Sequence, residues 1–275
     1  MKRLALSRAG ITAVASALTL TLATGCSDSS GDSGKSTGAD KETTAAKALS
    51  SAELGQRIIV TSDVDGYKVE STDKSDGFTT TKDDLEVKDE KCAPIAYVMA
   101  GLAPGDSAAD VKRVVTQDPS ASPSASPSKK LEDMTDEELD DAMKSITDAL
   151  TGTVTIVSLS SYEGDGAEKT LSSVSDAVKG CAGGFEAADK GDAQKITKVE
   201  SEKASGDGDE ALAFAVTVGA DGGDVTVHGE VVRHGSTVAT YYTLSLAAFS
   251  GETADGAADY DIPSEIIKAQ TAKLA

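Results

Sequence analysis

The chain has 275 residues and a formal net charge of −20 at pH 7, with 46 acidic and 26 basic residues. Such an acidic surface repels phosphate backbones and anionic lipid headgroups, which argues against nucleic-acid binding and against a helix lying on a membrane surface. The chain has no Trp and only four Phe, so few aromatic platforms exist for stacking on bases. Its length allows one substantial domain or two small ones.

The first 25 residues have the pattern of an export signal. Three basic residues among the first eight precede an apolar or small-residue segment over 9–23, too short to span a bilayer permanently. The segment ends in Ala-Thr-Gly before Cys26, which resembles the lipobox of bacterial lipoproteins, although Ala23 stands where leucine is commonest. The resemblance implies that residues 1–25 are removed and that Cys26 carries acyl chains such as palmitate, anchoring the protein on the extracytoplasmic face of the cell membrane. The alternative is an ordinary secreted protein in which Cys26 is incidental.

The chain has three cysteines, an odd number that in an exported protein normally indicates a free thiol. If Cys26 carries lipid, Cys92 and Cys181 remain in an oxidising compartment, where two otherwise single cysteines most often pair. We therefore predict a disulfide between Cys92 and Cys181. Metal or nucleophilic chemistry is the weaker alternative, because the sequence has no Cys-x-x-Cys and its two histidines lie far away.

Two low-complexity stretches follow the signal. Residues 26–47 are mainly Ser, Gly, Asp, Thr and Lys, a composition that cannot offset the entropy of ordering, so we expect a flexible tether behind the lipid. A Ser/Pro-rich stretch over 117–131 is expected to be a disordered insertion. A domain boundary fits its composition equally well, but the predicted disulfide crosses it, which favours one domain over 48–275.

The N-terminal part of this domain has weak patterns. A short helix with a serine N-cap is predicted within 49–60, and a strand is predicted at 67–70 after a turn. Residues 71–91 have no clear period. Residues 93–100 fit a strand or a helix, and the valines of 107–115 predict a short helix.

The middle of the chain has the strongest helical patterns. A capping box and apolar residues at intervals of three and four predict a helix over 135–150, ended by Gly152. A strand is predicted at 154–158. Apolar residues of 171–181 share one face of a second helix, which places Cys181 toward the core.

The C-terminal part predicts a meander of four strands and a last helix that begins at Pro263. The strand-like runs are 196–203, 211–218, 225–233 and 236–246, and glycine-containing turns separate them. Sequential antiparallel hairpins are the simplest arrangement, with one face buried. The whole predicts an α+β fold in which an antiparallel sheet, made of this four-stranded meander and additional strands, has helices packed on one face.

No catalytic or metal-binding motif in the sequence has complete spacing. Residues 61–72 approximate a calcium loop, but threonine occupies the first and twelfth positions, where carboxylates are required. No second histidine lies at metal-ligand spacing from His228, His234 occupies a turn, and no Gly-x-Ser-x-Gly elbow occurs. The acidic loops at 207–209 and 255–261 could bind calcium weakly, but solvated turns explain them better. We therefore expect no enzyme activity, no cofactor and no metal.

The folded region resembles a known class of sensor domain. A helix with the sequence Val174-Ser-Asp-Ala-Val-Lys-Gly-Cys181 precedes a meander that ends in Val231-Val-Arg-His-Gly-Ser-Thr-Val-Ala239. This order is similar to the extracellular sensor domain of PknH-type mycobacterial serine/threonine kinases and to related sensor-like lipoproteins, although that family's second disulfide has no counterpart. The composition and the lipobox together look like a lipoprotein of actinobacteria, such as Streptomyces. The resemblance implies an α+β domain with a cleft for an extracellular ligand and no catalysis.

Three functions are compatible with these patterns. The first is a membrane-anchored, non-catalytic ligand-binding or sensor-like module. The second is a lipid or glycolipid carrier with an apolar cavity, which a hollow interior would favour and a filled core would not. The third is a cell-envelope enzyme, which no motif supports. The expected partners are the membrane, through Cys26, and an unidentified small-molecule, lipid or protein ligand.

Overall fold

The computed structural model describes residues 47–72, 80–118, 135, 139, 152–220, 223–246 and 260–275. The described residues belong to one compact unit. The predicted signal peptide, the tether, most of the Ser/Pro-rich insertion and nearly all of the helix predicted over 135–150 lie outside the described residues.

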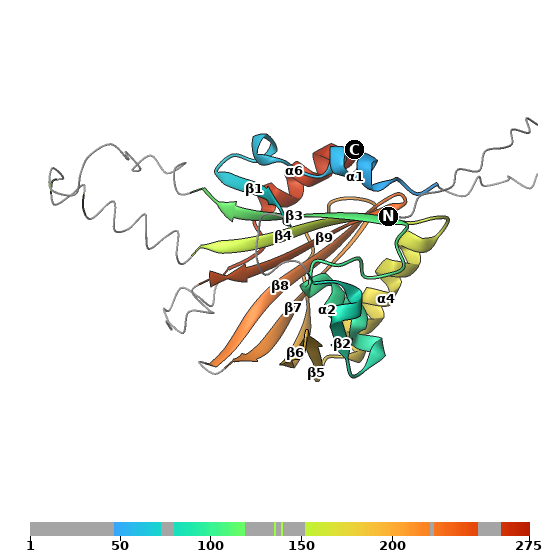
Figure 1. Cartoon of the computed structure of the whole chain (residues 1–275), viewed down its shortest axis with the longest axis vertical. Helices are drawn as coiled ribbons and strands as arrows, with labels where there is room; N and C mark the ends of the chain where they lie inside the picture. Colours follow the sequence, from blue (N-terminus) through green and yellow to red (C-terminus); the bar gives the residue numbers. More distant parts are fainter. Residues whose placement is uncertain are drawn as a thin grey trace, which may run out of the picture. The chain divides into compact units, whose positions relative to one another are not determined.

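Nine strands of the described chain form one antiparallel sheet with the order β1-β3-β4-β9-β8-β7-β6-β5-β2 (Figure 1). The strands are β1 (Tyr67–Ser71), β2 (Leu85–Val87), β3 (Ala109–Gln117), β4 (Thr153–Ser161), β5 (Phe185–Asp189), β6 (Asp192–Glu202), β7 (Glu210–Ala220), β8 (Gly223–His234) and β9 (Thr237–Ser245). The helices that pack on the sheet are α1 (Ser51–Arg57), α2 (Ala93–Met99), α4 (Gly166–Gly180) and α6 (Ser264–Leu274). This arrangement confirms the predicted α+β fold class.

The predicted C-terminal meander is present as β6, β7, β8 and β9. Each strand pairs antiparallel with the next, and β7 pairs with β8 from Glu210↔Arg233 to Ala220↔Gly223. Turn glycines with positive φ angles, such as Gly235 with φ 60°, separate the strands where the sequence predicted hairpins. The alternation of apolar residues was therefore sufficient to place these four strands.

The prediction of a helix over residues 107–115 is wrong, because most of these residues belong to β3. The spacing of the three valines fits a helix, but β-branched residues also favour strands, and pairing with β4 decides between the two. β3 and β4 pair from Ala109↔Ser161 to Thr116↔Val154. The strands on either side of the Ser/Pro-rich stretch thus belong to the same sheet.

Helices cover both faces of the sheet, whereas the sequence predicted cover on one. Tyr242 of β9 packs with α2 and α4 on the face that we call the inner face. Its neighbour Tyr241 points the opposite way and packs with α1 and α6 on the outer face. Figure 1 shows the two pairs of helices on different parts of the sheet, α1 and α6 near β1 and β3, and α2 and α4 beside β6 to β8. The physical reason is that β4 and β9 are buried on both faces, so each face needs its own cover.

Hydrogen bonds at the helix ends hold the outer layer. Ser50 caps α1 in a capping box with Glu53, since the Ser50 N–H donates to Glu53 Oε2 at 2.8 Å. The fully buried Gln270 of α6 accepts from the Ile59 N–H at 3.0 Å and donates to the Arg57 carbonyl at 2.9 Å. Helix α6 is thereby fixed to the end of α1.

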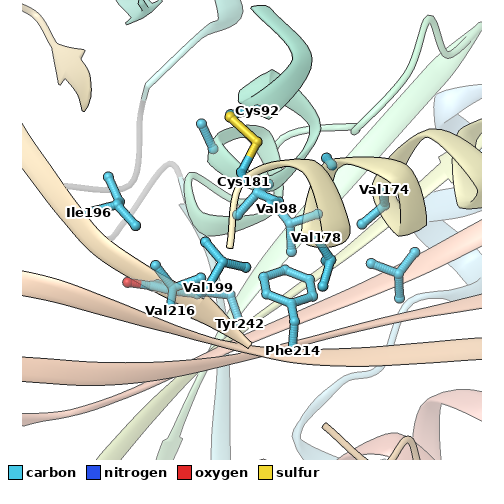
Figure 2. Packing of buried hydrophobic residues seen from close by; sticks show 14 of the residues in the cluster. Cys92, Val98, Val174, Val178, Cys181, Ile196, Val199, Phe214, Val216 and Tyr242 are labelled. Atoms are coloured by element: carbon cyan, nitrogen blue, oxygen red, sulfur yellow. A yellow bond between two sulfur atoms is a disulfide. The ribbon is translucent and has the colours of Figure 1, made fainter. Parts of the chain in front are cut away.

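The predicted disulfide between Cys92 and Cys181 is present in the structure, with a Cα–Cα distance of 5.9 Å. Both cysteines are buried. Cys92 directly precedes α2 and Cys181 directly follows α4, so the bridge fixes the start of one inner helix to the end of the other. Figure 2 shows the bridge above Val178 and Phe214, which fill the space between α4 and the sheet.

Candidate functional site

A cavity of about 250 Å³ lies between the inner face of the sheet and α2, and we call it the inner cavity. Its lining comes from six strands (β2, β4, β5, β6, β7 and β9), from α2 and the residue that follows it, and from Thr80, which precedes β2. The lining residues are Thr80, Leu85, Ala96, Met99, Ala100, Ile156, Ala187, Asp189, Gln194, Ile196, Val218, Tyr242 and Leu244. Figure 2 labels Ile196 and Tyr242, two of these lining residues. Most of these side chains are apolar, and Thr80, Asp189, Gln194 and the Tyr242 hydroxyl add polar atoms to the wall.

The cavity exists because α2 presents small side chains to the sheet. Ala96 and Ala100 are four residues apart and line the cavity together with Met99. Because an alanine side chain ends at Cβ, the helix leaves space above the sheet where a larger residue would fill it. The Cys92–Cys181 bridge fixes the start of α2 and so holds this wall of the cavity in place.

One end of the cavity is polar and carries Asp189. The side chains of Phe185, Ala187 and Asp189 alternate along β5 and so share the inner face of the sheet. Thr80 Oγ1 donates to Asp189 Oδ2 at 2.6 Å. The other carboxylate oxygen, Oδ1, is buried and has no hydrogen-bond partner among the residues that the structure describes. Asp189 is thus a carboxylate at the cavity wall, and one of its two oxygens has no hydrogen-bond partner among the described residues.

A more polar groove of about 590 Å³ adjoins the inner cavity, and Thr80 borders both. Lys82 and Lys112 line it. Lys82 Nζ donates to the Gly105 carbonyl at 2.6 Å and lies 4.7 Å from the centroid of the Tyr97 ring. Burial lowers the pKa of Lys112, although attraction to Asp110 and Asp189 opposes that effect. The groove wall also contains four hydroxyl residues. It comprises Thr72, Thr80, Thr81, Lys82, Leu102, Ala103, Asp106, Ser107, Asp110 and Lys112.

The two histidines lie apart from the inner cavity. His228 Nδ1 lies 2.9 Å from Glu202 Oε2, and the His228 ring meets the Tyr260 ring edge-on with centroids 4.9 Å apart. Burial lowers the pKa of His234, whose Nε2 has no partner within the described part of the chain. The structure therefore does not bring the histidines together with Asp189.

The acidic loops have structural partners in the described residues. Asp63 accepts from the Val60 N–H at 2.8 Å and from Lys273 Nζ at 2.6 Å. Asp209 accepts from the Gly235 N–H at 2.7 Å and forms an ion pair with Arg233 at 3.3 Å. Within the described ranges, no group of three or more His, Cys, Asp or Glu residues could hold a metal ion. Most of the acidic loop at 255–261, like the lipidation candidate Cys26, lies outside those ranges.

Sequence reasoning missed Asp189 and Thr80. The signal that could have found Asp189 is the run Phe-Glu-Ala-Ala-Asp over 185–189, in which the apolar alternation ends on a carboxylate. Asp189 becomes a candidate site residue only once the run is recognised as a strand with a buried face. Thr80 carries no such signal, because residues 71–91 have no period.

Neither a family model nor a curated protein sequence matches the chain. Among solved structures, the chain is similar to the extracellular domain of PknH from Mycobacterium tuberculosis, with 12% sequence identity and a TM-score of 0.45. That similarity covers 83% of this chain and 95% of the PknH domain. The resemblance noted in the sequence is to the same kind of domain. In the part of the chain that the structure describes, no helix has the length and apolar character needed to cross a membrane.

Proposed function

We propose that this chain is a membrane-anchored extracytoplasmic lipoprotein whose folded domain binds a small ligand without catalysing a reaction. The observation that carries the proposal is the inner cavity, an apolar space with a few polar groups at one end. Small-molecule sites usually have this form, with apolar walls for affinity and a few polar groups for orientation. The volume of about 250 Å³ lies just below the range of about 300–1,000 Å³ typical of drug-sized ligands. A small molecule is therefore the best fit.

The proposed location rests on the N-terminal sequence and on the disulfide. The basic start, the short apolar segment and Cys26 fit a lipoprotein signal. A disulfide between Cys92 and Cys181 fits an oxidising compartment, because such bridges are rare in proteins kept in the reducing cytosol. Both features support a domain held outside the cytoplasmic membrane.

The residues of the cavity wall support binding rather than catalysis. Acid–base or nucleophilic catalysis needs a reactive group with a second group that activates it. The polar groups of the lining are the Asp189 carboxylate, the Thr80 hydroxyl bonded to it, the Gln194 amide and the Tyr242 hydroxyl, with no His, Cys or Lys. This set can orient a ligand, but it offers no nucleophile activated by a base of suitable pKa.

The cavity volume favours a small ligand over the lipid-carrier alternative. An engineered cavity of about 150 Å³ in another protein holds one benzene molecule. A cavity of about 250 Å³ thus accepts a body somewhat larger than benzene, whereas two long acyl chains need several times that space.

A ligand-blocking variant tests the proposal. Ala100→Leu would fill the inner cavity from the end of α2, and Ala52→Leu makes the same change at an exposed position of α1. With 1-hexanol as an apolar probe, we expect saturable shifts of the methyl NMR signals of Met99 and Ile156. These shifts should persist in Ala52→Leu and disappear in Ala100→Leu. Unshifted Met99 and Ile156 signals in the unaltered protein, at probe concentrations near solubility, would show that the cavity does not bind ligands.

A further inference from the structure

We propose that the ligand of the inner cavity is a small primary amine with an apolar body, and that its ammonium group binds Asp189. This inference rests on the proposed function, because it names the chemistry of the ligand that the cavity takes.

The fold places Asp189 on the cavity side of the sheet. It is the last residue of β5, where it pairs with Leu85 of β2 and with Asp192 across the turn to β6. Its side chain lies on the same face as those of Phe185 and Ala187, which are both buried in the inner core. Leu85 and Ala187 line the cavity as Asp189 does, so apolar side chains adjoin the carboxylate at the polar end of the cavity.

One oxygen of the Asp189 carboxylate has no hydrogen-bond donor among the described residues. An ionised carboxylate has about four lone-pair sites, and Thr80 fills one of them on Oδ2. Oδ1 is buried without a partner among the described residues. Leaving a buried charged acceptor unpaired is costly, whereas a charged donor at this position forms the strongest class of hydrogen bond. An ammonium group supplies three donors from a compact charge and fits this need better than a hydroxyl.

The rest of the cavity defines the body of the ligand. Beyond Asp189, Thr80 and Gln194, the wall is formed by apolar side chains and by Tyr242. Compared with the cavity of about 150 Å³ that holds benzene, a volume of about 250 Å³ accepts a chain or ring of roughly six to eight carbons. The ligand class is therefore an alkylamine or arylalkylamine of that size.

The charge distribution favours a cation over an anion. The protein has a net charge of −20, so its field attracts cations and repels carboxylates. Lys112 in the adjoining groove attracts Asp189 and would compete with a ligand ammonium for it. Removing the charge of Lys112 should therefore strengthen amine binding.

Three probes of equal length test the inference. The full chain carries Cys26→Ser, so that no acyl chain of its own can occupy the cavity, and calorimetry at pH 7 measures binding of hexylamine, 1-hexanol and hexanoate. We expect hexylamine to bind roughly tenfold or more tightly than 1-hexanol, the gain typical of a hydrogen bond to a charged group. Hexanoate should bind most weakly, because its charge is repelled by Asp189.

Variants show whether Asp189 is responsible. Asp189→Asn keeps the shape of the side chain and should weaken hexylamine binding roughly tenfold or more while 1-hexanol binding stays within about threefold. Asp192→Asn removes the same charge from an exposed position three residues away and should change neither affinity. Lys112→Gln should tighten hexylamine binding alone.

The outcomes separate this inference from the proposed function. Equal binding of hexylamine and 1-hexanol, unchanged by Asp189→Asn, would overturn amine recognition and leave the cavity as a binding site. An equal loss of hexylamine affinity in Asp189→Asn and Asp192→Asn would show a general charge effect and would also overturn it. Failure of all three probes to bind the unaltered cavity would contradict the proposed function itself.

Discussion

Phe214 of β7 lies directly opposite Gly229 of β8, and its ring fills the space that a side chain at residue 229 would need. A Cβ added at Gly229 would lie 2.6 Å from the ring Cζ atom. Phe214 is fully buried at the centre of the inner core, where Figure 2 shows it beneath α4. A side chain at residue 229 would therefore force this buried ring to shift.

We expect Gly229→Ala to destabilise the fold by about 1–3 kcal/mol, the usual cost of overpacking a filled core. Urea unfolding followed by circular dichroism measures the change. Gly219→Ala is the matched control in β7, because a Cβ there would meet its nearest atom at 3.6 Å, an ordinary contact. Equal stability of the two variants would contradict the close packing of Phe214 on Gly229.

The Cys92–Cys181 bridge should stabilise the domain substantially. Removing a native disulfide from a secreted domain typically costs about 2–5 kcal/mol, and this bridge joins residues 89 positions apart. We expect Cys92→Ala and Cys181→Ala to lose the same free energy of unfolding, measured in urea without reductant. The double variant should be little worse than either single variant, because each removes the same covalent constraint. Additive losses, or two thiols that react with an alkylating reagent in the denatured unreduced protein, would contradict the bridge.

Cys26 should be the lipidated N-terminus of the mature protein. Cys26→Ser should move the protein out of the membrane fraction, or leave it unprocessed, because serine cannot carry the thioether-linked lipid. Ser27→Ala is a suitable control, since it changes the next residue without removing the thiol. Membrane fractionation and the intact mass of the mature chain measure both effects. Unchanged membrane association of Cys26→Ser would refute lipid anchoring through this residue.

The contact between Asp63 and Lys273 should give stability that depends on pH. The hydrogen bond from Lys273 lowers the pKa of Asp63 below its ordinary value of 3.8, so the folded protein keeps this carboxylate ionised more readily than the unfolded chain. Its contribution is complete above that ordinary value and is lost as the pH falls through the lowered pKa of the folded state. Asp63→Asn should cost no more than about 1 kcal/mol at pH 7 and nothing once the carboxyl is protonated.

Urea unfolding at several pH values below 7 measures this difference. Asp65→Asn, at an exposed acid two residues away, serves as the control. A loss from Asp63→Asn that persisted unchanged at the lowest pH would show that the Lys273 contact does not depend on the charge of Asp63.

Local patterns predicted the C-terminal meander, α1, α4 and the disulfide, because alternation, turn glycines and capping residues act over short stretches. They failed at β3, where valines with helical spacing form a strand through pairing with β4. They also failed to predict that helices cover both faces of the sheet. Tyr241 and Tyr242 are adjacent in sequence, yet each belongs to a different core. The inner cavity could not be predicted, because it depends on where α2 places Ala96 and Ala100 relative to strands far away in the sequence.

The position of the disulfide has a consequence for proteolysis. Cys92 and Cys181 lie on opposite sides of the Ser/Pro-rich stretch, which has the composition that proteases cut most readily. A single cut anywhere between the two cysteines leaves both fragments covalently joined. In a protein held at its N-terminus, the fragment that carries β6 to β9 would stay on the cell surface after such a cut. Shedding of that fragment would require reduction of the bridge as well as cleavage of the chain.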